Sequence, residues 1–288
     1  MQRVITAIVL VAAVVVVLFL GPGWLLSLAA ALVAVLAAWE YLQLASASAS
    51  NHGSTLRIPF WWMAIGTALC FVVTLPNFPG EAQLPVLSAL TLALFAWNGF
   101  RVPLSQVLVN SAQGLFGLLW IAYPLSLIPL IRKREDGIAL VLFLMLAVWA
   151  GDVAALYVGR AWGRHKLAPR LSPGKTWEGS IASVAGSLLA ATLLIIAGNA
   201  LARRAGGSTL LYISEPFWKM LVLAAILNVA AQTGDLLESA IKRGAGVKDS
   251  GTILPGHGGI LDRIDALLLA TPVLWFWLLL DRFYFGHF

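Results

Sequence analysis

Charged residues are scarce in this 288-residue chain. Asp, Glu, Lys and Arg together make up 11% of it, whereas 60% of the residues are hydrophobic. A soluble domain carries roughly 25% charged residues, and no water-soluble core accommodates so large an excess of apolar side chains. The shortage of charge therefore excludes an ordinary soluble fold and favours a protein embedded in lipid.

Cysteine is almost absent, because Cys70 is the only one in the chain. A single thiol excludes an intrachain disulfide and a thiolate metal cluster. The net charge of +6 would suit a nucleic-acid partner. However, the basic residues are scattered between apolar runs, so we expect no nucleic acid to bind.

Apolar runs recur along the whole chain, each roughly 15 to 25 residues long and thus about long enough to cross a 30 Å hydrocarbon layer as a helix. They predict an all-α, polytopic transmembrane helix bundle with about nine spans, eight or ten being the alternatives. The expected spans are 4–20, 24–44, 60–75, 84–98, 113–131, 138–158, 179–198, 216–241 and 263–281.

Three further features concern this organisation. The first span is expected to be an uncleaved helix rather than a secretory signal, because Gly21-Pro22-Gly23 leads directly into another apolar run. The Ser-rich segment 45–55 is predicted to be a flexible loop. We divide the chain into N-terminal membrane spans, 1–135, and a C-terminal catalytic membrane region, 136–288.

The distribution of basic residues indicates an orientation. With nine spans, 12 of the 19 Lys and Arg residues lie on the side of the N-terminus and the other 7 lie opposite. Cytoplasmic loops are enriched in Lys and Arg, so the first side is expected to be cytoplasmic. The run Arg132-Lys133-Arg134 falls on the opposite side and is the main argument against this span count.

Acidic residues gather near the C-terminus, where residues 235–265 contain 5 of the 13 acids. On the predicted helix 216–241 and its extension, Asp235, Glu238, Ser239 and Lys242 recur at i, i+3, i+4 and i+7, so they share one face. Ionisable groups at membrane depth cost several kcal/mol unless they are paired, hydrated or metal-bound. This face predicts a functional site, with a Glu238–Lys242 packing salt bridge as the alternative.

A glycine-rich segment, Pro255-Gly256-His257-Gly258-Gly259, precedes Asp262, Arg263 and Asp265. Glycines let backbone N–H groups approach an anion closely, although most such clusters are only turns. One acid at the start of a helix is explained by capping, but two acids one turn apart are not. Together with Lys242, Arg243 and Lys248, the segment predicts a phosphate and metal site.

A second polar cluster precedes the predicted span 179–198. It comprises Asp152, the bases Arg160, Arg164, Lys166 and Arg170, and the run Ser172-Pro173-Gly174-Lys175-Thr176-Trp177-Glu178-Gly179. The bases could simply contact anionic headgroups. Gly174-Lys175-Thr176 is not a P-loop, because Pro169 stands where that motif begins with glycine. Two spans separate the clusters, so we expect both on the same membrane face, around one ligand.

At these residues the chain resembles the phosphatidate cytidylyltransferase family, the CDP-diacylglycerol synthases. The resemblance covers about 150–270, and the chain departs from the family pattern just after Asp152, which makes that residue's role less secure. The matching segments are Gly234-Asp235-Leu236-Leu237-Glu238, Ser239-Ala240-Ile241-Lys242-Arg243, Lys248-Asp249-Ser250-Gly251, His257-Gly258-Gly259-Ile260-Leu261-Asp262-Arg263-Ile264-Asp265 and the run 172–179.

The resemblance implies that the phosphate of phosphatidate attacks the α-phosphorus of CTP, releasing pyrophosphate and forming CDP-diacylglycerol in phospholipid biosynthesis. Mg²⁺ is the expected cofactor, since divalent metal neutralises charge in phosphoryl transfer. CTP, phosphatidate and membrane lipids are the expected partners, and a homodimer is left open. The implied location is the bacterial cytoplasmic (inner) membrane, with the active site facing the cytoplasm.

Each candidate site residue has an expected role. The expected catalytic residues are Asp235, Asp262, Lys242, Arg243, Lys248 and Lys175. The expected Mg²⁺ ligands are, in order of preference, Asp235 and Asp262, then Asp265 and Asp249. The expected substrate-binding residues are Ser172, Thr176, Ser239, His257, Gly258, Gly259 and Arg263.

Other functions remain open at this point. A polyprenol kinase or an ether-lipid cytidylyltransferase would also use CTP in the membrane. A secondary transporter would show internal repeats, yet the face of Asp235 is not repeated in the first half of the chain. A CDP-alcohol phosphotransferase would need a denser run of spaced aspartates than this sequence has.

Overall fold

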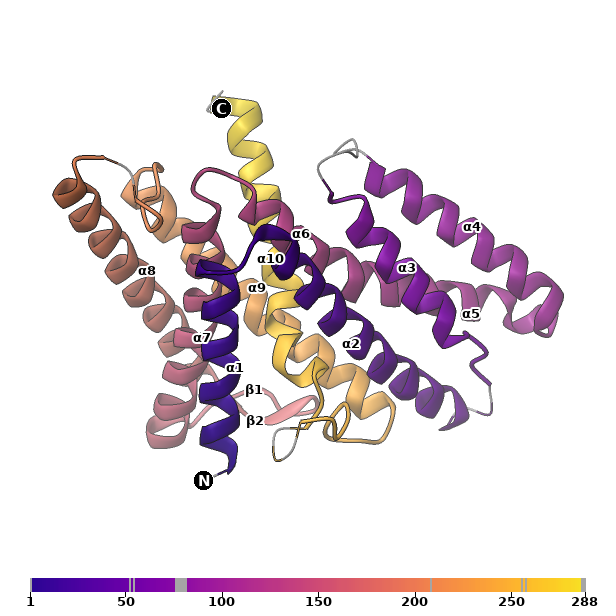
Figure 1. The fold of residues 1–288 in the computed structure, drawn as a ribbon. Helices are drawn as coiled ribbons and strands as arrows, with labels where there is room; N and C mark the ends of the chain where they lie inside the picture. Colours follow the sequence, from indigo (N-terminus) through magenta and orange to yellow (C-terminus); the bar gives the residue numbers. More distant parts are fainter. Residues whose placement is uncertain are drawn as a thin grey trace. The chain divides into compact units, whose positions relative to one another are not determined.

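The computed structural model describes residues 2–51, 53, 55–75, 82–207, 209–254, 256 and 258–285. Within them the helices are α1 Gln2–Phe19, α2 Gly23–Asn51, α3 Phe60–Val72, α4 Gln83–Arg101, α5 Leu104–Gly117, α6 Tyr123–Arg132, α7 Gly137–Trp162, α8 Trp177–Ala205, α9 Phe217–Gly244 and α10 Leu261–Phe285 (Figure 1). A π-helical segment, η2 Leu118–Ala122, joins α5 to α6. Two strands, β1 Lys166–Ala168 and β2 Ser172–Thr176, lie between α7 and α8.

The prediction of a polytopic transmembrane helix bundle is confirmed. Seven helices in the described part of the chain are long and apolar enough to cross a membrane: Gly23–Asn51, Gln83–Arg101, Leu104–Arg132, Gly137–Trp162, Trp177–Ala205, Phe217–Gly244 and Leu261–Asp281. The other two predicted spans coincide with α1 and with α3, which is a shorter apolar helix of 13 residues. The expected number of about nine spans is therefore approximate.

Two local predictions differ from the structure. Segment 45–55, expected to be a loop, continues α2 as far as Asn51, because Ala45 is buried and alanine favours helix over coil. The sequence analysis also predicts no strand, whereas β1 and β2 form a small antiparallel hairpin in which Lys166 pairs with Thr176 and Ala168 with Ser172. The strand β2 is hard to predict from sequence because it contains Pro173 and Gly174, and both residue types are uncommon within strands.

The chain divides into two compact units. The first comprises Met1–Pro129 and Ala240–Ile264, and the second comprises Leu130–Ser239 and Asp265–Phe288. In the first unit α2 packs against α3, α5 and η2, and α4 packs against α5.

The contact between α2 and α5 is close because Gly117 has no side chain. A Cβ atom on Gly117 would lie 2.6 Å from Cε1 of Tyr41. The Tyr41 hydroxyl donates to the carbonyl of Gln113 over 2.8 Å, and the Tyr41 ring meets the Trp120 ring edge-on at a centroid distance of 6.1 Å. These contacts fix the rotation of α2 and leave the neighbouring Glu40 fully buried, with an exposed fraction of 0%.

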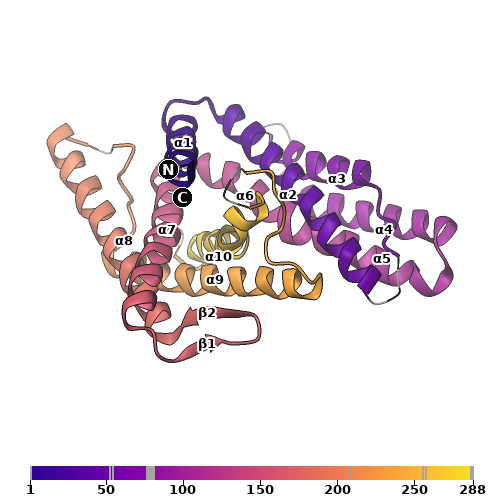
Figure 2. The same cartoon turned by 90° about the horizontal axis from the view of Figure 1, so that it is seen from below.

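In the second unit α7 and α8 lie side by side, and the hairpin projects from their connected ends (Figures 1 and 2). A buried polar network joins α8 to α9. The Asn228 amide donates to the hydroxyls of Ser183 and Ser187 over 2.9 and 2.7 Å, and the Gln232 amide donates to Asn228 Oδ1 over 2.6 Å. Ser187 in turn donates to the carbonyl of Ala147 on α7. Satisfied polar groups of this kind hold helices together in lipid.

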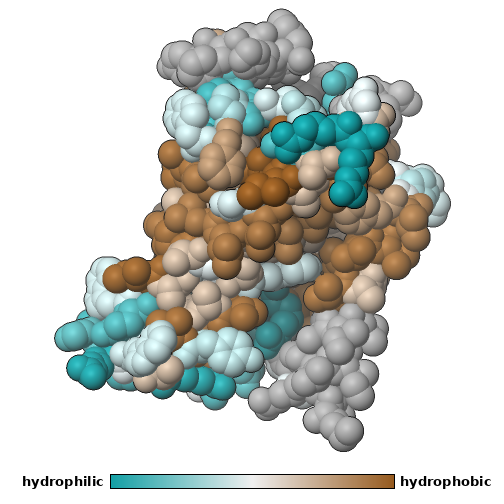
Figure 3. All heavy atoms as spheres, turned by 90° about the vertical axis from the view of Figure 1, so that its left-hand side faces the viewer, coloured by the Kyte–Doolittle hydropathy of each residue, from teal (hydrophilic) through white to brown (hydrophobic). Residues whose placement is uncertain are grey.

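The outward face of α8 is apolar. Ile181, Leu189, Leu193 and Ile196 have exposed fractions of 68, 61, 58 and 55%. Figure 3 looks onto the side that α8 occupies at the left of Figure 1, and it shows a hydrophobic band between more hydrophilic ends. Such a band fits a helix whose middle lies in hydrocarbon and whose ends reach the headgroups.

Gly151 on α7 lies against the polar network and gives a test of this packing. A Cβ atom there would lie 2.8 Å from the hydroxyl oxygens of Ser183 and Ser187. We expect Gly151→Ala to destabilise the protein by about 1–3 kcal/mol, as overpacked cores do. Thermal unfolding in detergent measures the change. Gly99→Ala is the matched control, since a Cβ on that helical glycine meets nothing within 4 Å; equal melting temperatures for both variants would contradict the packing described.

Candidate active site

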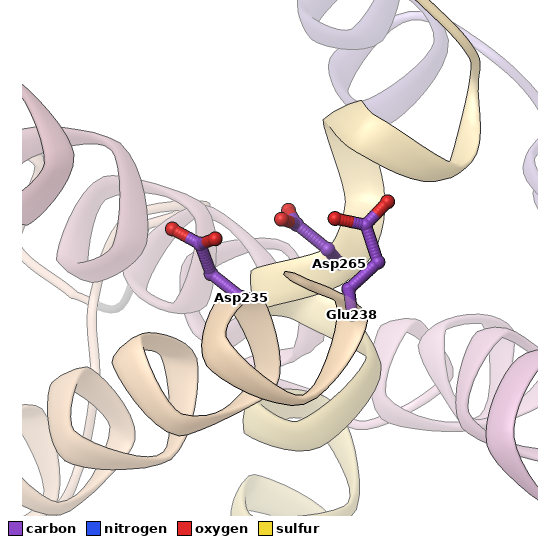
Figure 4. A group of neighbouring side chains, drawn as sticks. All are labelled: Asp235, Glu238 and Asp265. Atoms are coloured by element: carbon purple, nitrogen blue, oxygen red, sulfur yellow. The ribbon is translucent and has the colours of Figure 1, made fainter. Parts of the chain in front are cut away.

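Three carboxylates of the second unit converge from two helices. Asp235 and Glu238 lie one turn apart on α9, and Asp265 lies in the second turn of α10 (Figure 4). One oxygen from each lies within 4.8 Å of the other two. Gly234 makes this approach possible, because a Cβ there would lie 2.6 Å from the backbone oxygen of Asp265. The acidic triad is thus formed by close contact between α9 and α10.

The donor set of the acidic triad fits a divalent cation. Glu238 is fully buried, and Asp235 and Asp265 are partly buried. Like charges at this spacing destabilise one another, and hard cations such as Mg²⁺ and Ca²⁺ prefer carboxylate oxygens. The triad contains the predicted ligands Asp235 and Asp265. It also contains Glu238, to which the sequence analysis assigned no ligand role although its spacing from Asp235 placed it on the same face.

The hairpin places a positively charged lysine side chain beside the acidic triad. Lys175 on β2 forms an ion pair with Asp235, with Nζ 2.6 Å from Oδ2. The next residue, Thr176, ends the strand and caps α8, since its Oγ1 accepts the backbone N–H of Gly179 over 3.2 Å. The same end of the hairpin is also held by Glu178, whose carboxylate accepts from the ring and the backbone N–H of His165. The structure thus places Lys175 beside Asp235, and its binding of the triphosphate stays a prediction.

Asp262 lies in the first unit and has a different environment. Its Oδ1 accepts from Lys242 Nζ over 2.6 Å. Its Oδ2 accepts the backbone N–H groups of Ser250 and Gly259 over 2.9 and 2.8 Å, and the Ser250 hydroxyl lies 3.1 Å away. Three donors, the Lys242 ammonium group and two backbone N–H groups, therefore hold this carboxylate. The N–H of Gly259, predicted to meet a phosphate, is directed at Asp262.

Glu40 is the residue of this region that sequence reasoning missed. It lies in the middle of α2, and its carboxylate accepts the backbone N–H groups of Ile260 and Leu261 over 3.0 and 2.8 Å and the hydroxyl of Ser250 over 2.9 Å. One signal was available, since an ionisable residue inside an apolar span suggests a functional role. Its partners lie 210 to 221 residues away, however, and no motif links them.

The remaining predicted residues lie outside the acidic triad, in varied environments. Arg243, Lys248, Asp249 and Arg263 are exposed, and Ser239 and Thr176 are buried. Gly258 has a φ of 81°, a conformation that favours glycine. Ser172 lies at the start of β2, and Asp152 is an exposed residue of α7. His257 lies outside the described residues.

The chain belongs to the cytidylyltransferase family, whose sequence model matches residues 1–281. Proteins called phosphatidate cytidylyltransferase are similar to it along nearly their full length. The one from Haemophilus influenzae is 34% identical over 94% of this chain and 96% of its own, and the one from Staphylococcus saprophyticus is also 34% identical with the same coverage. The resemblance found at the sequence motifs is thereby confirmed.

A relative of the same name from Brucella suis is 44% identical to the chain. This match covers 57% of the chain and 55% of the relative, so the two align over about half of that protein's length.

Proposed function

We propose that this protein is a phosphatidate cytidylyltransferase, which transfers the cytidylyl group of CTP to phosphatidate and thereby makes CDP-diacylglycerol for phospholipid biosynthesis. The acidic triad with Lys175 beside it supports the proposal most directly. Carboxylates that can hold a divalent cation, with a lysine within 2.6 Å of one of them, suit a reaction between phosphate groups. Family membership narrows that chemistry to cytidylyl transfer.

Asp235, Glu238 and Asp265 are the proposed ligands of Mg²⁺. When bound, the ion would neutralise the negative charge that develops on the phosphates during transfer. Asp262 and Asp249 were also predicted as ligands. We now propose that Asp262 holds Lys242, Ser250 and Gly259 in place, because its oxygens already accept from these three residues. Asp249 stays a second-choice ligand.

The remaining proposed roles concern the substrates. Lysine and arginine neutralise phosphate charge, arginine with two parallel donors and lysine as a point charge. The proposed phosphate-binding cations are Lys175, Lys242, Arg243, Lys248 and Arg263. The further substrate-binding residues proposed are Ser172, Thr176, Ser239, His257, Gly258 and Gly259.

The reaction needs no strong protein base. A bond forms between a phosphate oxygen of phosphatidate and the α-phosphorus of CTP, and the bond from that phosphorus to the oxygen shared with the β-phosphate breaks. Pyrophosphate leaves with the electron pair of the broken bond. The attacking phosphate is already anionic near neutral pH, so the contribution of the side chains is to position the two substrates and neutralise their charge.

We place the protein in the bacterial cytoplasmic (inner) membrane with the site facing the cytoplasm, where CTP is soluble and the acyl chains of phosphatidate remain in lipid. The excess of basic residues on that side supports this orientation. We assign the chemistry to residues 136–288, and residues 1–135 are the N-terminal membrane spans. The proposed assembly is a homodimer, and light scattering of the detergent-solubilised protein measures whether it forms.

The decisive experiment supplies purified protein with CTP, phosphatidate and Mg²⁺. We expect CDP-diacylglycerol and pyrophosphate in equal amounts, and we expect EDTA to abolish both while added Mg²⁺ restores them. Replacing phosphatidate by a polyprenol or an ether-linked lipid phosphate tests the alternative acceptors. Absence of pyrophosphate with phosphatidate, or a higher rate with another acceptor, would overturn the proposal.

A further inference from the structure

The feature that the proposed function leaves unexplained is the buried carboxylate of Glu40 in an otherwise apolar stretch of α2. The residue is 0% exposed. Burying an isolated carboxylate costs several kcal/mol, and only good hydrogen bonds offset this cost. A leucine or glutamine would fill the same space at a smaller cost of burial. The structure must therefore explain why the two carboxylate oxygens of Glu40 lie where they do.

Both Glu40 oxygens contact the start of α10. Oε1 accepts the N–H of Ile260 over 3.0 Å, and Oε2 accepts the N–H of Leu261 over 2.8 Å. The first N–H groups of a helix have no partner within it, and a negative charge beside them is stabilised by the helix dipole. Such a cap usually comes from the adjoining residues, whereas here it comes from another helix. Glu40 therefore ties α2 to the point where α10 begins.

The backbone around Glu40 leaves no spare room. A Cβ atom on Gly251 would lie 2.6 Å from Oε1 and 2.9 Å from Cδ of Glu40, and a Cβ on Gly259 would lie 2.6 Å from the same Oε1. The absence of side chains at Gly251 and Gly259 thus lets the backbone at these two residues lie directly on the carboxylate. Glu40 and these two residues fix each other's position.

A chain of hydrogen bonds leads from Glu40 to a proposed phosphate-binding lysine. The Ser250 hydroxyl donates to Oε2 of Glu40 over 2.9 Å, and the backbone N–H of the same residue donates to Oδ2 of Asp262 over 2.9 Å. Asp262 in turn holds Lys242 Nζ at 2.6 Å. All four residues belong to the first unit. Moving the Glu40 carboxylate would therefore shift Ser250, then Asp262 and with it the ammonium group.

We propose that Glu40 is a positioning residue: its buried carboxylate holds Ser250 and the start of α10 so that Asp262 presents Lys242 to a substrate phosphate. The inference rests on the proposed function for the identity of that phosphate. The positioning of Ser250 and the start of α10 by Glu40 follows from the contacts of Glu40 and does not depend on the proposed function. Glu40, a residue of the N-terminal spans, thereby supports the position of residues in the C-terminal catalytic region.

The first test is kinetic. Glu40→Gln keeps the shape but replaces one acceptor oxygen by an NH₂ group that faces a backbone donor. We expect the KM of at least one substrate to rise about tenfold, because misplaced Lys242 weakens phosphate binding. A general loss of folded protein would lower kcat alone. Ser250→Ala, which removes only the hydroxyl that donates to Glu40, is expected to shift the same KM in the same direction. Unchanged KM values for both substrates in both variants would overturn the inference.

A double-mutant cycle tests the contact itself. Gly251→Ala alone is expected to lower kcat/KM about tenfold, because its Cβ would displace the Glu40 carboxylate. In a Glu40→Ala background those atoms are gone, so the same substitution is expected to cost less than about twofold. Equal effects in the two backgrounds would show that Glu40 does not set the position of the backbone at Gly251.

Hydrogen exchange separates this inference from the proposed function, because it requires no activity. We expect the amides of Ile260 and Leu261 to exchange at least about tenfold faster in Glu40→Gln, while the exchange of α7 and α8 is unchanged. Asp281→Asn is the matched control: it removes a different, partly buried carboxylate, which pairs with Lys219 at 2.7 Å, and should leave those two amides unaffected. Exchange that rises equally in both variants contradicts the inference, whereas a wild-type protein without cytidylyltransferase activity contradicts only the proposed function.

Discussion

Replacing Asp265 with asparagine is expected to lower the rate of CDP-diacylglycerol formation about a thousandfold at saturating substrates and to weaken Mg²⁺ binding. The physical reason is the acidic triad: Asp235, Glu238 and Asp265 each offer one oxygen within 4.8 Å of the others. An amide supplies a neutral oxygen, so the site loses one of three charges that attract the cation. A contribution of about 4 kcal/mol to charge stabilisation corresponds to this loss of rate.

Titration of activity against Mg²⁺ measures the effect, and binding of Mn²⁺ followed by electron paramagnetic resonance measures it without turnover. The informative comparison is Asp262→Asn. Because Asp262 accepts from Lys242, Ser250 and Gly259, its substitution should lower activity but move the half-saturating Mg²⁺ concentration by less than about threefold. If both variants require the same elevated Mg²⁺ concentration, the metal does not belong to the triad alone.

Replacing Lys175 with methionine is expected to lower kcat/KM for CTP by about a hundredfold to a thousandfold. The ammonium group lies 2.6 Å from Oδ2 of Asp235, at the end of a hairpin whose position is fixed by the cap at Thr176. A cation held in a fixed position stabilises the charge that develops on the phosphates in the transition state. Removing one such group typically lowers the rate a hundredfold to a thousandfold. Steady-state rates at varied CTP concentration measure the change.

Two further variants make the Lys175 result specific. Lys175→Arg keeps the charge and is expected to retain more activity than the methionine variant, although the longer planar group changes the geometry. Lys166→Met is the matched control, since Lys166 lies on the other strand of the hairpin and is exposed. If Lys166→Met costs as much as Lys175→Met, the effect comes from the hairpin as a whole rather than from the ion pair with Asp235.

The transmembrane class of this protein could be predicted from single runs of sequence, because each span needs only local hydrophobicity to match the thickness of a bilayer. The hairpin β1–β2 could not be predicted in this way. Its strands are three and five residues long and contain Pro173 and Gly174, so their pairing depends on the ends of α7 and α8 that the hairpin joins. The continuation of α2 through Ala45 likewise depends on burial that composition does not reveal.

The candidate site was predictable to the extent that its residues share one helix. Asp235 and Glu238 are three residues apart, and helix geometry alone places them on one face of α9. The choice between Asp262 and Asp265 was not predictable, because both lie in the first turns of α10 and both resemble ligands. Contact between Gly234 and the backbone of Asp265 brings Asp265 to the triad, and a glycine's role in such a contact has no signature in sequence.

The sequence by itself therefore determined that the chain crosses the membrane repeatedly, that it belongs with the cytidylyltransferases, and that Asp235 and Glu238 face the same way. Tertiary structure alone decided which residues meet them. It brought Asp265 to Asp235, Lys175 from a hairpin to the same carboxylate and, in the first unit, Glu40 to the start of α10. The physical reason is that hydrophobicity and helical periodicity act over a few turns, whereas contacts across tens to hundreds of residues depend on how whole helices pack.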